Sequence, residues 1–274
     1  MGTPDICLPS LDYLRNNQEL CAIITGEDKS RGRGNKLTPT PVATWAEEHK
    51  IKTYKTKNYK EILDIERPDI IIVLAYGKIL PKEVLDYCKY GCINLHGSLL
   101  PKYRGAAPIQ QAIINGDKIT GMTAQKMAEA LDTGDILLQK ELAIKHDDTS
   151  GSLFNKMAIL AKETLEELLN NIDNIMPIKQ DESKATYAKM LTKENSFIDT
   201  NKTCDEVINF IRGYNPNPVA RYSYKGEILK VYEAIKSDVG LAIKCSDGYI
   251  RLTKVQPPNK KIMQDTEYLN GRKK

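Results

Sequence analysis

The first two thirds of this chain alternate short apolar runs with amphipathic stretches, and this limits the fold more than any other feature. The apolar runs are rich in β-branched residues and lie at 19–25, 69–76 and 91–96. Runs this short and continuous predict parallel strands that are covered on both faces. Helical patterns separate them, at 9–18, 41–50 and 59–66. The order predicts right-handed βαβ units, hence an α/β fold with an open, mostly parallel, Rossmann-like sheet.

The composition and periodicity of the sequence change after a long amphipathic stretch at 149–172. Before that stretch, two further strands are expected at 121–127 and 135–144, with a turn between them. From about 176 the sequence is polar, which is typical of a linker. After a short helix at 203–215, short alternating segments separated by turn residues predict a small, OB-like β-barrel. We therefore predict an α/β domain at 1–178, a linker at 179–194 and a β-barrel domain at 195–274.

Composition excludes several classes of protein. No apolar run approaches the roughly 20 residues needed to cross a bilayer, and the N-terminus has no signal-peptide pattern. The six cysteines are scattered without a zinc-like spacing, so we expect reduced thiols in a core, no metal site and a cytoplasmic location. The net charge of +4 permits a nucleic-acid partner without requiring one. No membrane association is expected.

One polar group stands out at the end of an apolar run. Residues 94–104 read NLHGSLLPKYR. Residues two apart in a strand face the same side, so Asn94 and His96 are expected to point together at the carboxyl edge of the sheet, where such folds bind ligands. Their N–H groups could both donate to an oxyanion, and His96 could carry protons. If the Gly-containing turn LDTG folds back, Asp132 could orient the imidazole. On these residues alone, an ordinary polar strand end remains an alternative.

Longer motifs carry a resemblance to a known family. The segment NLHGSLLPKYRGAAPIQQAIINGDKITG, followed by LDTGDILL, closely resembles the methionyl-tRNA formyltransferases. MGTPD, GRGNKLTPTPV, AYGKILPKEVL and the terminal LNGRKK also resemble this family, in the same order along the chain. The shorter pattern H-x-SLLP with a downstream Asp-x-Gly is shared by the wider group of folate-dependent formyltransferases.

The resemblance implies an enzyme that moves the formyl group of 10-formyltetrahydrofolate to the α-amine of methionine on initiator tRNA, for translation initiation. It implies Asn94, His96 and Asp132 as the catalytic residues, with no metal. The family's folate-binding segment matches Ser98, Leu99, Leu100 and Pro101. The expected partners are initiator methionyl-tRNA and the folate co-substrate, and a monomer is expected.

A basic loop is the candidate for tRNA contact. Residues 28–36 read DKSRGRGNK and carry Lys29, Arg31, Arg33 and Lys36. A charge run of this kind is often only solvated loop, but phosphate contacts require such a loop. The resemblance implies that this loop contacts the acceptor arm, with Arg33 the preferred residue, and that the second domain helps to hold tRNA.

The chain departs from the family at its start. Relatives usually have a short apolar strand before MGTPD, and here the sequence begins at this Met. That first strand would be central in the sheet, and its loss would remove buried side chains worth about 1.5–3 kcal/mol each. We expect either an internal start site, with a longer true protein, or a damaged fold.

Two rival functions remain open from the sequence. A hydrolase that releases formate from the same folate could use Asn94, His96 and Asp132 equally well, with water in place of the amine. The basic loop and the second domain argue against it. A truncated, inactive protein that binds folate or tRNA is the other alternative, because of the absent strand.

Overall fold

The structure is a computed structural model that describes residues 1–31, 36–56 and 58–272. The chain forms two compact units that interleave along the sequence. The first contains Met1–Ala106, Gly121–Leu142 and Phe154–Tyr187, and the second contains Ala107–Thr120, Ala143–Leu153 and Ala188–Lys274. The functional domain bounds at 178 and 195 stay a prediction.

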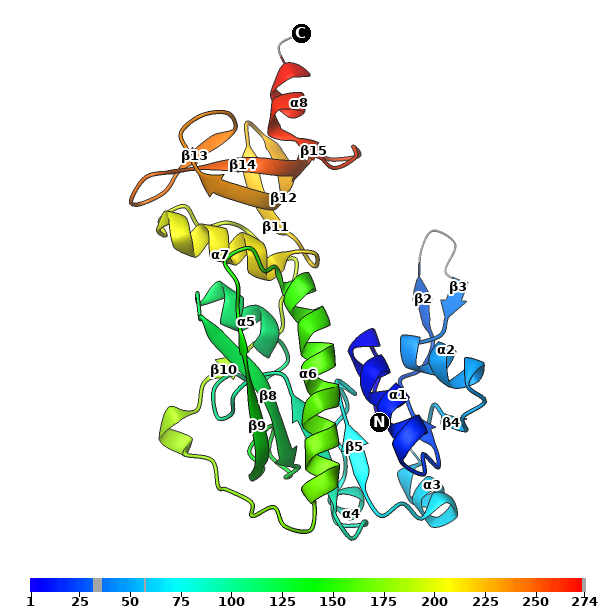
Figure 1. Cartoon of the computed structure of the whole chain (residues 1–274). Helices are drawn as coiled ribbons and strands as arrows, with labels where there is room; N and C mark the ends of the chain where they lie inside the picture. The colour runs from blue at the N-terminus through cyan, green and yellow to red at the C-terminus, as the bar shows by residue number, and fades with distance from the viewer. Residues whose placement is uncertain (32–35, 57, 273–274) are drawn as a thin grey trace. The chain divides into compact units, whose positions relative to one another are not determined.

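The first unit is built on a four-stranded sheet with the order β5-β6-β8-β9 (Figure 1). The strands are β5 (Ile71–Val73), β6 (Cys92–His96), β8 (Ile119–Lys126) and β9 (Ile136–Ala143). β5 and β6 are parallel, whereas β6 and β8 are antiparallel. A separate parallel pair joins β1 (Ile23–Ile24) to β4 (Thr53–Tyr54). The Rossmann-like α/β fold is confirmed, and its antiparallel part adds a neighbour to the strand that carries Asn94 and His96.

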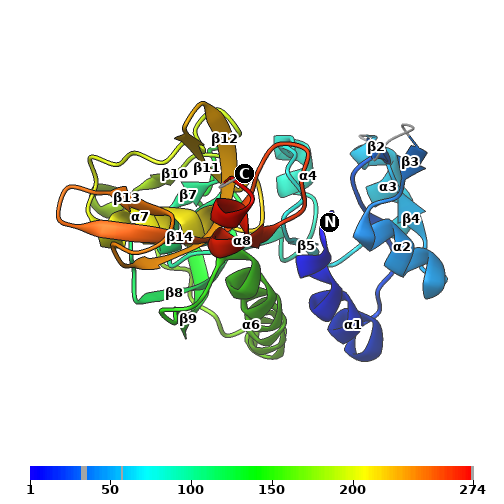
Figure 2. The same cartoon turned by 90° about the horizontal axis from the view of Figure 1, so that it is seen from above.

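Helices accompany these strands, and all but η1 and α4 occur where the sequence patterns predict them. They are η1 (Asp5–Cys7), α1 (Leu8–Asn17), α2 (Pro41–Glu48), α3 (Tyr59–Glu66), α4 (Lys82–Leu85) and α6 (Ser150–Asn171). The Thr40 hydroxyl accepts from Ala43 N at 3.0 Å and so fixes the start of α2. α6 lies along β8 and β9 (Figures 1 and 2), and its apolar stripe, which includes Leu153, Met157, Leu165 and Leu168, is fully buried.

Met1 and Gly2 lie between β1 and β5. Gly2 N donates to Ile24 O at 3.1 Å, and the Met1 ammonium donates to Ile72 O at 2.5 Å. Leu74 N donates to Met1 O at 3.0 Å. These two residues therefore pair on both sides, in the central place that the sequence predicts for the first strand. A cavity of about 440 Å³ borders them, lined mainly by apolar residues of α1, β1, α3 and β5.

Several short elements occur where the sequence predicts only loop. β2 (Lys29–Arg31) and β3 (Lys36–Thr38) form an antiparallel hairpin. β7 (Arg104–Gly105) pairs with β10 (Tyr187–Ala188), and η2 (Glu182–Lys184) precedes β10. Arg104 N donates to Thr186 O at 2.8 Å. The polar segment after residue 176 thus returns to the first unit before the chain continues.

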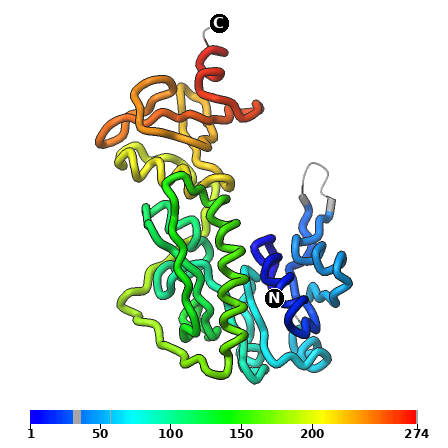
Figure 3. The backbone as a smooth tube through the Cα atoms, in the orientation of Figure 1, coloured from blue at the N-terminus to red at the C-terminus, as the bar shows by residue number. Residues whose placement is uncertain are grey.

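The second unit has a curled five-stranded sheet with the order β11-β12-β14-β13, and β15 pairs with β14. Its strands are β11 (Ala220–Tyr224), β12 (Glu227–Lys236), β13 (Ala242–Lys244), β14 (Tyr249–Gln256) and β15 (Met263–Gln264). Its helices are α5 (Pro108–Ile114), α7 (Cys204–Tyr214) and α8 (Asp265–Asn270). Figure 3 traces the backbone of this unit from α7 to α8 in yellow to red. A capping box of Thr203 and Glu206 starts α7, whose apolar face packs on the sheet.

Candidate active site

Asn94 and His96 stand at the carboxyl end of β6, next to the antiparallel strand β8. The register places Asn94 opposite Gln125 and His96 opposite Thr123. Leu95, between them, is 2% exposed and belongs to the core. Alternate residues of a strand leave the same face, so Asn94, His96 and Gln125 share one side of the sheet.

His96 is buried, and both of its ring nitrogens face oxygens. Nε2 lies 2.9 Å from Tyr103 O, and Nδ1 lies 3.5 Å from Asp132 Oδ1. A neutral imidazole carries only one N–H, whereas an imidazolium donates from both nitrogens. A carbonyl oxygen can only accept, so Nε2 donates to Tyr103 O, and Nδ1 is the ring nitrogen that faces the carboxylate. Sequence analysis placed Asp132 beside His96, and the structure brings the two together.

The Asp132 carboxylate is held by groups from two other segments. Oδ2 accepts from Gly105 N at 2.8 Å, and Oδ1 accepts from Gln125 Nε2 at 2.9 Å. Only 8% of this side chain is exposed. Two N–H donors from separate segments therefore fix the position of the carboxylate beside His96.

Asn94 and Gln125 keep polar atoms without a protein partner. Within the described residues, the half-buried Asn94 side chain makes no hydrogen bond, and the buried Gln125 Oε1 has none. A donor amide and an acceptor carbonyl are thus left beside His96 and Asp132. Unpaired buried polar atoms are costly unless a ligand or water meets them. Sequence analysis missed Gln125, although its alternate position in the predicted strand 121–127 could have shown it.

The segment Ser98–Pro101 follows β6 and is hydrogen-bonded to residues of β8 and β9. Ser98 is completely buried and its hydroxyl donates to Lys102 O at 2.5 Å, while Leu100 is 3% exposed. Leu100 N donates to Thr123 Oγ1 at 3.1 Å, and Gln139 Nε2 donates to Leu100 O at 2.9 Å. Leu99 and Pro101 are only half-buried. Of the four predicted folate residues, these two have side-chain surface left for a ligand.

The basic candidates lie around the β2–β3 hairpin. Lys29 is exposed and pairs with Thr38, and Arg31 pairs with Lys36 in the hairpin register. Arg33 lies outside the described residues. Among the four basic candidates, Lys29, Arg31 and Lys36 thus have a described backbone, in β2 and β3.

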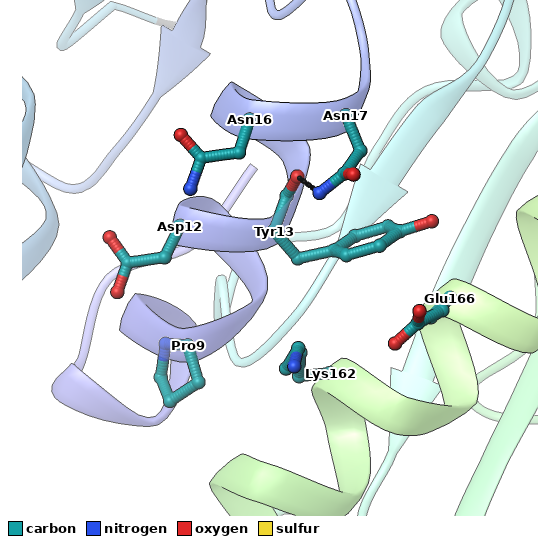
Figure 4. Close-up of a pocket in the computed structure, with 7 residues that line it drawn as sticks. All are labelled: Pro9, Asp12, Tyr13, Asn16, Asn17, Lys162 and Glu166. Carbon is teal, nitrogen blue, oxygen red and sulfur yellow. Dashed lines mark hydrogen bonds between the residues drawn. The ribbon is translucent and has the colours of Figure 1, made fainter.

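Two cavities in the first unit lie elsewhere. One of about 350 Å³, lined by residues of α1 and α6, is shown in Figure 4, where the Tyr13 ring of α1 extends to the side of α6 that carries Glu166. Asn17 Nδ2 donates to Tyr13 O there at 2.9 Å. The other is the apolar cavity beside Met1. Neither is lined by Asn94, His96 or Asp132.

Two features bear on metals and membranes. Across residues 1–31, 36–56 and 58–272, no three His, Cys, Asp or Glu side chains gather as a metal-binding set. Over the same described ranges, none of the helices has both the length and the apolar character to span a bilayer.

Comparison with known proteins places the chain among formyl transferases. Residues 2–169 match the formyl transferase family, and residues 190–273 match the formyl transferase C-terminal domain. A methionyl-tRNA formyltransferase of Clostridium acetobutylicum is 43% identical over 99% of this chain and 95% of its own length.

Solved structures of similar fold include two formyltransferases. A methionyl-tRNA formyltransferase from Clostridium thermocellum has a TM-score of 0.60 at 22% identity, covering 89% of this chain and all of its own. An N-formyltransferase from Helicobacter canadensis, in complex with folinic acid and dTDP-3-aminofucose, has a TM-score of 0.68 at 20% identity. The match covers 91% of this chain and 95% of that one. At these identities the likeness shows the fold.

Proposed function

The chain belongs to the methionyl-tRNA formyltransferase family, and on this premise we propose that it formylates the α-amine of methionine on initiator tRNA, with 10-formyltetrahydrofolate as donor. The amine forms a C–N bond to the formyl carbon, and the bond from that carbon to folate N10 breaks. The proton that the amine loses passes to N10. The products are N-formylmethionyl-tRNA and tetrahydrofolate, which corresponds to a step of translation initiation in the cytoplasm.

The observation that carries the proposal is the convergence of Asn94, His96 and Asp132 at the end of β6. The Asn94 amide is a donor without a competing partner, which suits the oxyanion of a tetrahedral intermediate. His96 Nε2 already donates towards Tyr103 O, so His96 can donate to the same oxyanion only after that bond opens. We therefore assign the first role in oxyanion stabilisation to Asn94.

The His96–Asp132 pair is suited to proton transfer. A protonated His96 held against a carboxylate can give its proton to folate N10 and take up the proton that the amine loses, and Asp132 stabilises the imidazolium before and after this exchange. The Gln125 carbonyl oxygen, buried and unpaired within the described chain, is an acceptor that an N–H of the attacking amine can use. In this scheme the residues present supply both the donor and the acceptor that the reaction requires.

Binding of the two substrates is assigned to separate segments. Leu99 and Pro101 offer partly exposed apolar surface for the folate, while Ser98 and Leu100 anchor that segment from inside. The basic residues Lys29, Arg31, Arg33 and Lys36 are the candidates for phosphates of the tRNA acceptor arm. A monomer suffices for this arrangement.

The test is a formyl-transfer assay with labelled 10-formyltetrahydrofolate, run with and without methionyl-initiator tRNA. We expect label on methionine that depends on the charged tRNA. Release of free formate at the same rate without tRNA would instead identify a hydrolase, and the absence of any turnover would identify an inactive binding protein. Either of these two results contradicts the proposal.

A further inference from the structure

The most informative group outside the proposed chemistry is Gln180, in the polar segment that the sequence predicts as a linker. Its side-chain amide lies against the turn that carries Asp132. Gln180 Nε2 donates to Asp132 O at 2.8 Å and to Gly134 O at 2.7 Å. One amide nitrogen therefore joins both ends of the turn 132–134.

The oxygen of the same amide also accepts two hydrogen bonds. Gln180 Oε1 accepts from Arg104 Nε at 3.1 Å and from Arg104 Nη2 at 2.7 Å. A flipped amide would place oxygen against two carbonyls and N–H groups against a guanidinium, so the orientation is fixed by chemistry. All hydrogen-bonding groups of the Gln180 amide are in use.

Arg104 is itself immobilised. It is 1% exposed, and its guanidinium makes a bidentate contact with the Glu182 carboxylate, at 2.8 and 2.7 Å. This contact holds the pKa of Glu182 below its usual range. Arg104 also precedes Gly105, whose N–H binds the Asp132 carboxylate. Gln180 is thus tied to a residue whose neighbour holds Asp132 directly.

The turn needs such support because its conformation is unfavourable by itself. Asp132 has a φ of +53°, in the left-handed region that residues other than glycine rarely adopt. A side chain at position 134 would collide with the Lys126 carbonyl, so glycine is required there. Gln125 and Gly105 hold the carboxylate, whereas Gln180 binds the backbone carbonyls of the turn.

We propose that Gln180 is a positioning residue, which holds the turn 132–134 so that the Asp132 carboxylate faces His96 Nδ1. The inference rests on the proposed function, because its effect is measured through formyl transfer. Loss of the two donors lets the turn relax, and a shift of the carboxylate by about 1 Å can cost on the order of 10²-fold in rate. Substrate contacts are not altered by this loss.

The experiment compares Gln180→Glu with Gln180→Met and with the control Ser183→Ala. Glu keeps the size and the acceptors towards Arg104 but removes both donors to the turn, and Met removes all hydrogen bonds. The Ser183 hydroxyl bonds only within its own segment, to Asp181. We expect kcat to fall about 10- to 100-fold in both Gln180 variants, with KM for folate and for tRNA within twofold and Ser183→Ala unchanged.

Two further readouts separate positioning from simple loss of stability. We expect the pH profile of kcat to shift in the Gln180 variants, because the His96–Asp132 proton is held differently, and amide exchange at residues 131–135 to accelerate. A kcat within twofold of the parent in a folded variant, with an unchanged pH profile, overturns the inference. That outcome leaves the proposed function intact, whereas failure of the parent chain to formylate methionyl-tRNA overturns the function itself.

Discussion

The first unit contains two regions that are built in opposite ways, the polar cluster at the end of β6 and the apolar edge between β1 and β5. In the cluster, Asp132 is bound by groups from three separate segments, through Gly105, Gln125 and Gln180. At the edge, the backbone of Met1 and Gly2 bonds to β1 and to β5, beside a cavity of about 440 Å³. The Asp132 carboxylate is thus held by several directional bonds, whereas the apolar edge is only partly filled.

The contrast separates two physical requirements. A catalytic group must be held within a fraction of an ångström, which takes several directional bonds from different parts of the chain. The apolar edge contributes stability through contact area, and a cavity forfeits contacts in proportion to its size. We therefore expect changes in the cluster to act on kcat, and changes at the edge to act on the free energy of unfolding.

The largest expected effect is that of Asp132→Asn. The variant keeps the shape of the side chain but removes the negative charge that stabilises a protonated His96. We expect kcat to fall by about 10²- to 10⁴-fold, with folate binding largely retained. Formyl-transfer kinetics and folate titration measure the two effects.

Asp135→Asn is the matched control, because Asp135 lies in the same loop and is partly exposed. We expect it to keep kcat within about twofold. Equal losses in the two variants would show that the loop tolerates no change of charge, and the specific role of Asp132 would be withdrawn.

A smaller effect is expected at the apolar edge. Placing four β-branched residues before Met1 supplies backbone and side chains in line with Met1, next to the cavity. Because each buried apolar side chain is worth about 1.5–3 kcal/mol and ordering the chain costs part of this, we expect unfolding to become harder by about 2–5 kcal/mol. Urea unfolding measures this change.

A polar extension of equal length, Ser-Asn-Ser-Asn, is the control for that experiment. We expect it to leave the free energy of unfolding almost unchanged, and both extensions to leave kcat within about twofold. If both extensions stabilise equally, the cavity is not an apolar slot for a strand.

The pH dependence of stability gives a third comparison at the same edge. Burial lowers the pKa of the Met1 amino group from its ordinary value of 8.0. Below pH 8.0 the unfolded chain therefore binds this proton more readily than the folded chain. The free energy of unfolding falls as pH drops from 8.0 towards the folded pKa, with a slope of at most about 1.4 kcal/mol per pH unit.

Acetylating the Met1 amine removes this titration and should flatten the curve below pH 8.0. Acid unfolding curves of the parent and the acetylated chain measure the difference. A parent chain whose stability rises as pH falls through this window would contradict the assignment of a buried ammonium.

The smallest effect is expected from the basic hairpin. Arg33→Ala should raise KM for tRNA about threefold and reduce the slope of log KM against log salt by about 0.7–0.9, as expected for one lost phosphate contact. kcat should not change. The exposed Arg15 of α1 provides the control, Arg15→Ala. An unchanged salt slope in Arg33→Ala would discard the contact.

Sequence patterns predicted the elements with long apolar periodicity. The helices with a clear amphipathic pattern lie within one or two residues of their predicted bounds: α1, α2, α3, α6 and α7. An apolar stripe that repeats over this length fits a helix and does not fit a strand. The predicted strands 19–25 and 69–76 are only partly paired in β1 and β5, beside the cavity. Short elements such as β7 and β10 depend on partners about eighty residues away, which a local pattern does not contain.

The same distinction holds for the candidate site. The spacing of Asn94 and His96 in one strand was enough to predict that they face the same side. Asp132 was added to them through the resemblance and through its Gly-containing turn. Gln180 could not be found in this way, because its importance lies in bonds to Asp132, Gly134 and Arg104 across the fold. Gln125 was missed, although strand alternation in the predicted strand 121–127 gives its side.

The central claim is that His96 and Asp132 act as one unit at the end of β6, and a double-mutant cycle on kcat tests it most directly. We measure formyl transfer by His96→Ala, Asp132→Ala and the double variant. The account predicts that the double variant is about as slow as the slower single variant, because either change destroys the same unit. If the two losses in kcat multiply, the residues act independently and the account is contradicted.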